Sequence, residues 1–249
     1  MADPAPQEVT RDTLLGGRIA FQQPANGYRA AIDPVLLAAA VPDRVQGQVA
    51  DLGCGAGAAM LCLAARLPHV RIVGVEREPG LAALARQNIA ANGFHSRITV
   101  VEADVSQLPR TLEPGIFDAV ISNPPYLEPD RANRTTSRDK LIATVEGTAD
   151  LPTWIDAGLR LLRPRGVIVM IQRADRLADL LAALGGRAGE IVVYPLWPKA
   201  GMPAKRIIVR ARKELKSPLV VAPGLVLHHP DGTYTAAAEA VLRGGAGLG

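Results

Sequence analysis

The chain has 249 residues, 48% of them hydrophobic and 21% charged, with a formal net charge of +4 at pH 7. No apolar run reaches the roughly 18 residues of a membrane span, and residues 1–11 lack the basic and apolar regions of a signal peptide, so we expect a cytoplasmic globular protein. The two cysteines and four histidines are not spaced as metal ligands, so we expect neither a disulfide nor a metal site.

The first 45 residues are expected to form an N-terminal arm and a lead-in helix. Residues 1–20 are polar and predict a loosely ordered arm, with a short strand and turn between Asp12 and Gln23 that covers the core. Asp33 is suited to cap a helix and Pro34 to begin it, because proline has the helical φ and no N–H to leave unpaired. The helix is predicted over residues 35–40 and ends before Pro42.

Residues 46–215 alternate between apolar strands and helices, which predicts a doubly wound α/β fold with a parallel sheet. Strands are predicted from residue 49 and at 71–76, 98–104, 117–122 and 167–172, with helices at 58–66, 79–92, 151–162 and 176–184. Two further strands, 188–195 and 205–213, have only a short connection and must be antiparallel neighbours. Residues 216–249 are expected to form a tail that packs on or near this core.

A glycine-rich turn, Gly53-Cys54-Gly55-Ala56-Gly57, follows the first core strand and precedes a helix. Glycines let the backbone approach a ligand closely, and a helix N-terminus favours a negative group, so this is a nucleotide-binding turn. The turn also satisfies the looser dinucleotide pattern, which leaves NAD as an alternative at this point.

Acidic residues stand at the carboxyl ends of three successive strands, where such sheets bind their ligands. They are Asp51, Glu76 and Asp104. Asp51 can face a cationic aminoacyl or sulfonium group but would repel a pyrophosphate. Glu76 is placed to accept from a ribose diol, as in NAD enzymes, and Asp104 to accept from an adenine amino group. Together the three acids favour S-adenosylmethionine as the cofactor.

The tetrapeptide Asn123-Pro124-Pro125-Tyr126 directly follows the strand at 117–122. Neither proline can donate to a sheet ladder, and together they force Asn123 into an extended conformation, so the strand ends in a stiff turn. The Asn123 side-chain oxygen and the Pro124 carbonyl can each accept one N–H, while Tyr126 offers a ring. This arrangement suits a planar group with an NH₂, such as a nucleobase or an amide, and predicts the catalytic site of a methyltransferase.

The glycine turn, the three acids and the tetrapeptide resemble, in order and spacing, the class I S-adenosylmethionine-dependent methyltransferases that act on exocyclic amines or amides. The lead-in from Gly27 to Leu37 is similar to that of the bacterial adenine-N6 methyltransferases that modify valine tRNA. The resemblance implies a single Rossmann-like domain with a seven-stranded, mostly parallel sheet and one antiparallel strand. Tyr28 and Asp33, within the lead-in, are candidates to border the cofactor's methionine end or the target base.

Basic residues are concentrated after the tetrapeptide. Residues 1–126 hold 10 basic and 12 acidic residues, whereas residues 127–249 hold 18 and 12. A localised excess of positive charge predicts a polyanionic partner, usually nucleic acid. The segment 127–140 is expected to be a mobile loop over the site. The candidates for contact with an RNA backbone are Trp197, Lys199, Lys205 and Arg206, with Arg131, Arg134 and Arg138 of that loop.

The sequence therefore predicts methyl transfer to the N6 of an adenine in RNA, with tRNA favoured. A protein glutamine-N5 methyltransferase is an alternative, because an amide NH₂ presents the same two hydrogens. Those enzymes resemble this core but usually carry a helical N-terminal domain, and only a short segment precedes Asp51 here. A guanine-N2 rRNA methyltransferase and a module that docks RNA without catalysis are further alternatives. The sequence specifies no oligomeric state.

Overall fold

The computed structural model describes residues 8–26, 31–125 and 149–249. Several residues predicted to contribute to the site, or to close over it, lie outside these ranges. They are Tyr28, Tyr126, Arg131, Arg134 and Arg138, with the rest of the segment 127–140. None of the helices within the described ranges is both long and apolar enough to cross a membrane.

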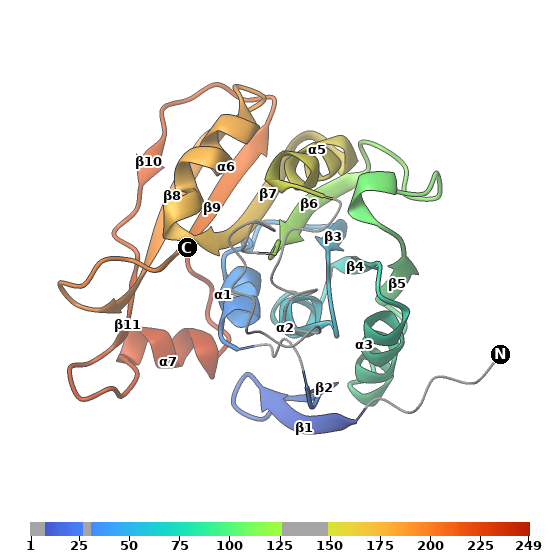
Figure 1. The fold of residues 1–249 in the computed structure, drawn as a ribbon, viewed down its shortest axis with the longest axis horizontal. Helices are drawn as coiled ribbons and strands as arrows, with labels where there is room; N and C mark the ends of the chain where they lie inside the picture. The colour runs from blue at the N-terminus through green and yellow to red at the C-terminus, as the bar shows by residue number, and fades with distance from the viewer. Residues whose placement is uncertain (1–7, 27–30, 126–148) are drawn as a thin grey trace.

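A central sheet runs through the molecule in the order β8-β9-β7-β6-β3-β4-β5 (Figure 1). Its strands are β3 (Gln48–Leu52), β4 (Arg71–Glu76), β5 (Ile98–Glu102), β6 (Phe117–Ser122), β7 (Leu162–Arg173), β8 (Ala188–Lys199) and β9 (Arg206–Lys213). Only β9 is antiparallel to its neighbours, and the other pairs are parallel. The predicted seven-stranded, mostly parallel sheet with one antiparallel strand is therefore confirmed.

The tail adds two short strands beside β8, namely β10 (Val220–Val221) and β11 (Leu225–His228). β8 continues to Lys199 instead of ending at residue 195, because β11 pairs with its last residues. β7 begins at Leu162 instead of residue 167, because Leu162 already pairs with Phe117 of β6. Both differences arise from pairing between distant segments, which local turn signals do not report.

Helices cover both faces of the sheet (Figure 1). They are α1 (Asp33–Ala39), α2 (Ala58–Arg66), α3 (Pro79–Ala91), η1 (Val105–Gln107), α5 (Leu151–Leu161), η3 (Ala174–Arg176), α6 (Leu177–Leu184) and α7 (Ala236–Leu242). Alternate residues of β7 belong to different cores: Val169 packs with α1 and α2, whereas Met170 packs with α5 and α6. A strand buried on both faces is apolar along its length, which is why these strands were recognisable as uninterrupted runs.

An N-terminal hairpin replaces most of the loosely ordered arm that the sequence predicts. β1 (Val9–Leu14) pairs antiparallel with β2 (Ile19–Pro24), and Phe21 of β2 is buried. The side-chain amides of Asn88 on α3 and of Asn92, the C-cap of α3, bond to the backbone of β2. Asn88 exchanges two 2.8 Å hydrogen bonds with the backbone of Gln22, and Asn92 accepts from Ala20 N at 3.0 Å and donates to Ala20 O at 2.7 Å. The two asparagines, one helical turn apart, therefore satisfy backbone groups of β2 that a third strand would otherwise pair with.

The C-terminal tail lies against the lead-in helix. Thr235 caps α7, its hydroxyl accepting from Ala238 N at 3.1 Å, and Ala238 is fully buried in the core that includes α1. Beyond α7, Leu248 N donates to the Ala39 carbonyl at 2.8 Å. The tail thus closes one side of the core formed by α1 and α2.

Candidate active site

The glycine turn leaves β3 at the carboxyl end of the parallel strands. The backbone N–H groups of Gly53 and Cys54 donate to the Val75 carbonyl of β4 at 2.8 and 3.0 Å, which fixes the turn to the neighbouring strand. Gly53 has a φ of +68°, and a Cβ there would stand 2.6 Å from the indole ring of Trp154 on α5. Gly55 also has a positive φ, but a Cβ built on it meets no heavy atom of the described chain within 4 Å. Gly57 is the N-cap of α2.

Asp51, the next-to-last residue of β3, is a buried carboxylic acid with only 2% of its surface exposed. Its Oδ2 has no hydrogen-bond partner among the described residues. Burial and the nearby charge of Glu76 raise its pKa from 3.8 to about 8, although the Met60 backbone N–H favours the ionised form. A buried acid with an unpartnered oxygen beside a ligand-binding turn suits a cationic ligand group.

Glu76, the last residue of β4, holds the turn from the other side. Its Oε2 accepts from Gly55 N at 2.8 Å and its Oε1 from Glu78 N at 2.9 Å. Burial raises the pKa of this carboxyl, and the surrounding backbone N–H groups counteract that shift. Each carboxylate oxygen can accept more than one hydrogen bond, so Glu76 can fix the turn and still accept from a ligand hydroxyl.

Asp104 lies beyond the strand that was predicted to end with it. β5 ends at Glu102, and Asp104 caps η1, its Oδ1 accepting from the N and Oγ of Ser106 at 2.8 and 2.6 Å. Its Oδ2 lies 4.0 Å from a guanidinium nitrogen of Arg77. The expected contact with the adenine of a cofactor stays a prediction for this residue.

The tetrapeptide leaves β6 next to the glycine turn. In the parallel register Leu52 of β3 stands opposite Ser122 of β6, and the Ser122 hydroxyl donates to the Leu52 carbonyl at 2.8 Å. Gly53 and Asn123 each follow this pair by one residue, so the two motifs begin at the same level on adjacent strands. Asn123 is half-buried and Pro124 is buried. The structure therefore brings together the two motifs that the sequence singled out separately.

Gln172 is a site residue that the sequence reasoning missed. It belongs to β7 and is fully buried, and its Nε2 lies 3.5 Å from the carbonyl oxygen of Pro125, to which it donates. Its Oε1 accepts from Arg173 N at 2.9 Å. Since Ser122 pairs with Met170, Gln172 stands beside the tetrapeptide. In the sequence, the only signal for a role of Gln172 was its single amide directly after the apolar run at 167–171.

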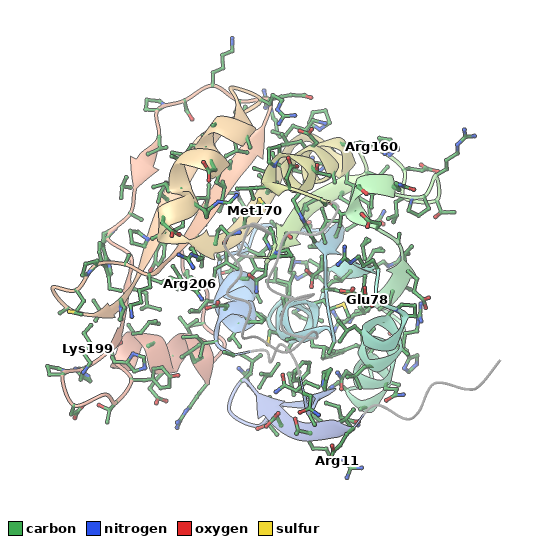
Figure 2. All side chains as sticks on the ribbon, viewed as in Figure 1. Arg11, Glu78, Arg160, Met170, Lys199 and Arg206 are labelled. Atoms are coloured by element: carbon green, nitrogen blue, oxygen red, sulfur yellow. The ribbon has the colours of Figure 1, made fainter. Side chains whose placement is uncertain are left out.

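Asp33 and Arg206, predicted for two different roles, form one ion pair. Asp33 is the first residue of α1, preceded by Ile32, and is not its cap as predicted. Its Oδ2 lies 3.1 Å from Arg206 Nε, and Arg206 stands next to α1 (Figure 2). This pair connects the lead-in helix to the first residue of β9.

Trp197 and Lys199 hold the tail against β8. The indole N–H of Trp197 donates to the Pro223 carbonyl at 3.0 Å, and the Lys199 ammonium donates to the Pro230 carbonyl at 2.7 Å. Figure 2 shows Lys199 at the outer end of the sheet, near the segment that precedes α7. Lys205 is exposed. Lys199 therefore has a structural contact in addition to any role with RNA.

Comparison with known proteins identifies the family. Residues 30–147 match the family described as methyltransferase small domain. The chain is 30% identical over 209 residues to a tRNA1(Val) (adenine(37)-N6)-methyltransferase of Aeromonas hydrophila, with 83% of this chain and 85% of that protein covered. It is also 30% identical over 230 residues to the enzyme of that name from Yersinia pseudotuberculosis, with 89% of each chain covered. The chain belongs to this methyltransferase family.

Solved structures agree with the methyltransferase fold. A predicted O-methyltransferase from Agrobacterium tumefaciens superposes with a TM-score of 0.72 at 30% identity, covering 87% of this chain and 98% of the other. A SAM-dependent O-methyltransferase from Thermotoga maritima has a TM-score of 0.55 at 18% identity, covering 78% and 69%, and supports the fold alone. A geranyl diphosphate methyltransferase in complex with SAM has a TM-score of 0.51 at 15% identity, covering 72% and 82%.

The described residues of this methyltransferase fit S-adenosylmethionine, its cofactor. Asp51 has a buried carboxyl oxygen without a partner among the described residues, which could face a cationic group, and the absent side chain of Gly55 leaves room for close approach to the backbone. Glu76, which accepts from Gly55 N, has further acceptor capacity that would suit a diol. These carboxylates would repel a pyrophosphate, so the site differs from a dinucleotide-binding site. Among the described residues, no group of three or more His, Cys, Asp and Glu side chains could hold a metal ion.

Proposed function

We propose that this methyltransferase modifies the exocyclic N6 of an adenine in tRNA, and that the adenine is position 37 of tRNA1(Val), as the names of its relatives state for those proteins. The observation that supports the proposal most directly is the juxtaposition of the tetrapeptide and the glycine turn on adjacent strands. A tRNA substrate is consistent with the cytoplasmic location that the sequence predicts.

The bound cofactor supplies an electrophilic methyl group on a sulfonium. An adenine N6 is a poor nucleophile because its lone pair is delocalised into the ring. Asn123 Oδ1 and the Pro124 carbonyl each accept one N–H of the amine, which orients the lone pair toward the methyl group and stabilises the positive charge that develops on nitrogen. Gln172 is a positioning residue, since its amide donates to the Pro125 carbonyl and steadies the turn.

The remaining predicted residues bind the two ligands. Asp51 faces the cationic end of the cofactor, Glu76 accepts from its ribose and Asp104 from its adenine. Tyr126 stacks on the target base, a contact worth roughly 1–3 kcal/mol. The base must leave its own stack to reach the tetrapeptide. Tyr28, outside the described residues, is proposed to border the cofactor's methionine end or the target base.

Lys199, Lys205 and Arg206 are proposed to contact the RNA backbone. The Lys199 ammonium donates one hydrogen to the Pro230 carbonyl, which leaves two hydrogens that can be donated to phosphate oxygens. Arg206 is paired with Asp33, so its contribution to RNA binding is smaller than that of an unpaired arginine. The exposed ammonium of Lys205 is the simplest phosphate contact of the three.

Methylation of a hydroxyl group is the second candidate, because the Agrobacterium tumefaciens structure is described as a predicted O-methyltransferase. A hydroxyl has one hydrogen to donate, whereas the tetrapeptide offers two acceptors, Asn123 Oδ1 and the Pro124 carbonyl. An NH₂ group can donate to both acceptors at once, whereas a hydroxyl can donate to only one of them. The geometry therefore favours nitrogen as the methyl acceptor, and the comparisons do not favour the protein glutamine or guanine-N2 alternatives.

A panel of acceptors tests this proposal. Purified protein is incubated with cofactor labelled in its methyl group and with bulk tRNA, rRNA or a protein extract. We expect label in tRNA, and we expect digestion to release it as N6-methyladenosine. Label confined to protein would indicate an amide acceptor, and label in a ribose 2′-hydroxyl would indicate oxygen methylation. Either result contradicts the proposed function.

A further inference from the structure

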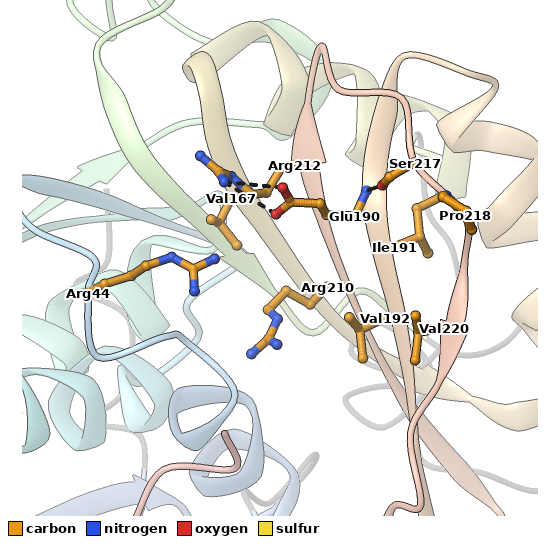
Figure 3. A pocket seen from close by; sticks show the side chains of 10 residues that line it. All are labelled: Arg44, Val167, Glu190, Ile191, Val192, Arg210, Arg212, Ser217, Pro218 and Val220. Carbon is orange, nitrogen blue, oxygen red and sulfur yellow. Dashed lines mark hydrogen bonds and ion pairs between the residues drawn. The ribbon is translucent and has the colours of Figure 1, made fainter.

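A further pocket is lined by residues of β7, β8 and β9 and by Arg44, which follows α1 (Figure 3). The pocket has a volume of about 420 Å³, and Val167, Val192 and Val220 contribute its apolar surface. Val167 pairs with Ala119 of β6, which in turn pairs with Val49 near the start of β3. Arg210 of β9 pairs with Val169, which lies level with Ile121 of β6 and Asp51 of β3. The pocket therefore reaches from the start to the middle of these strands, and β7 and β6 separate Arg210 from β3. It shares no residue with the cofactor site.

Three arginines and one acid supply the charge of this pocket. Arg212 lies 3.2 Å from Glu190 and also donates to the Arg165 carbonyl at 3.0 Å, so these two opposite charges neutralise each other. Arg44 makes no hydrogen bond or ion pair with any residue of the described ranges. Arg210 donates one N–H to the main-chain oxygen of Gly249, the last residue of the printed sequence. Within the described ranges, no Asp or Glu side chain forms an ion pair with Arg44 or Arg210.

The two guanidinium groups extend toward each other across the pocket (Figure 3). Burial and the charge of Arg44 lower the pKa of Arg210, while Glu190 opposes that shift. Arginine does not lose its proton in proteins, so this unfavourable environment cannot be relieved by neutralisation. An anion between the two groups relieves both the repulsion and the lost hydration. Phosphate suits the site because the guanidinium fork matches its oxygens in pairs.

We propose that Arg44 and Arg210 form a phosphate-binding site, separate from the catalytic site, that holds a backbone phosphate of the bound tRNA. The RNA source of the phosphate rests on the proposed function. Three residues of β7 separate Val169, which pairs with Arg210, from Gln172, or about 10 Å along the strand at 3.3 Å per residue. This span is short relative to a folded tRNA, so one RNA can occupy both sites. A free phosphate ion is the other source of the same chemistry.

The test uses the full-length chain with Arg44→Gln, Arg210→Gln and the double substitution. Arg187→Gln is the matched control, because it removes the same charge from a surface ion pair with Asp156 outside the pocket. Dissociation constants for tRNA are measured between 50 and 200 mM salt, together with kcat. For the double variant we expect a rise of about 10-fold in Kd and a salt slope smaller by about 1, with kcat unchanged at saturating tRNA.

Inorganic phosphate distinguishes the two sources. If tRNA binding is unchanged, but phosphate raises the melting temperature of the wild-type protein and not that of the double variant, the site is present and its ligand is a free phosphate. If the double variant matches the Arg187→Gln control in both measurements, the proposal is wrong. Unchanged cofactor affinity verifies that the variants are folded. The phosphate measurement does not depend on methylation, so it tests the pocket even if the proposed function fails.

Discussion

The buried carboxyl of Asp51 predicts a specific pH dependence of stability. Its pKa is about 8 in the folded protein, against an ordinary value of 3.8 in the unfolded chain. Between these two values the folded state therefore holds one more proton than the unfolded state. The free energy of unfolding falls as pH rises through this window, by about 1.4 kcal/mol per pH unit, and the loss is complete above the folded pKa. From pH 5 to pH 7 the loss is about 3 kcal/mol.

The substitution Asp51→Asn removes this titration while it keeps the shape of the side chain and an acceptor for Met60 N–H. The unfolding free energy of the variant, relative to wild type, should therefore rise by about 3 kcal/mol between pH 5 and pH 7 and level off above pH 8. Urea unfolding without cofactor, followed by tryptophan fluorescence at each pH, measures this difference. Glu113→Gln, which changes an exposed carboxyl, is the control and should follow wild type.

The same substitution should weaken cofactor binding, because the cationic group loses its carboxylate partner. We expect an increase of about 10- to 100-fold in the dissociation constant of S-adenosylmethionine, measured by calorimetric titration. Asp51 therefore opposes folding above its ordinary pKa and favours binding, as expected of a functional residue. If Asp51→Asn and wild type lose stability in parallel from pH 5 to pH 8, the reasoning is refuted.

Three further substitutions, with Asn92→Ala as the matched comparison for one of them, test the supports of the site. Gln172→Leu removes the donor to the Pro125 carbonyl, so kcat should fall by about 10-fold while the KM for cofactor changes little in steady-state assays. An unchanged kcat would contradict the positioning role of Gln172. Asn88→Ala removes hydrogen bonds to both β2 and the glycine turn, so it should lower the free energy of unfolding by about 2–3 kcal/mol and also weaken cofactor binding. Asn92→Ala removes bonds to β2 but none to the turn, so it should lower stability alone. Equal cofactor affinity in the two variants would argue against a role of Asn88 in holding the glycine turn. Gly53→Ala places a Cβ 2.6 Å from an indole ring at a φ of +68°, and should cost at least about 2 kcal/mol in thermal unfolding; a melting temperature equal to wild type is the contrary result.

Local patterns predicted the core and its motifs well. The helix at 58–66 and the strands at 71–76 and 117–122 have the predicted bounds, because the glycine turn and uninterrupted apolar runs mark them in the sequence. The shared level of Gly53 and Asn123 was not predicted, but it agrees with the predicted parallel sheet, because the carboxyl ends of parallel strands meet at one edge.

Contacts between distant residues were not predictable in this way. Gln172 and Pro125 are 47 residues apart, and Arg206 and Asp33 are 173 apart. No sequence period connects residues so far apart. Arg206 could therefore be assigned to RNA from its charge, but its ion pair with Asp33 could not be predicted. The strand at Val9–Leu14 was missed because alternate residues are only half-buried and its polar composition is that of an arm. Its order comes from pairing with β2, which α3 holds in place.

The chemistry assigned to the tetrapeptide is tested most directly by the modified nucleoside itself. Purified wild-type protein and Asn123→Ala are incubated with S-adenosylmethionine and tRNA1(Val) transcripts that carry adenine or guanine at position 37, and the digested RNA is analysed by mass spectrometry. The account predicts N6-methyladenosine only from wild-type protein with the adenine transcript. Equal N6-methyladenosine from Asn123→Ala, or methylation of the guanine transcript to the same extent, would contradict it.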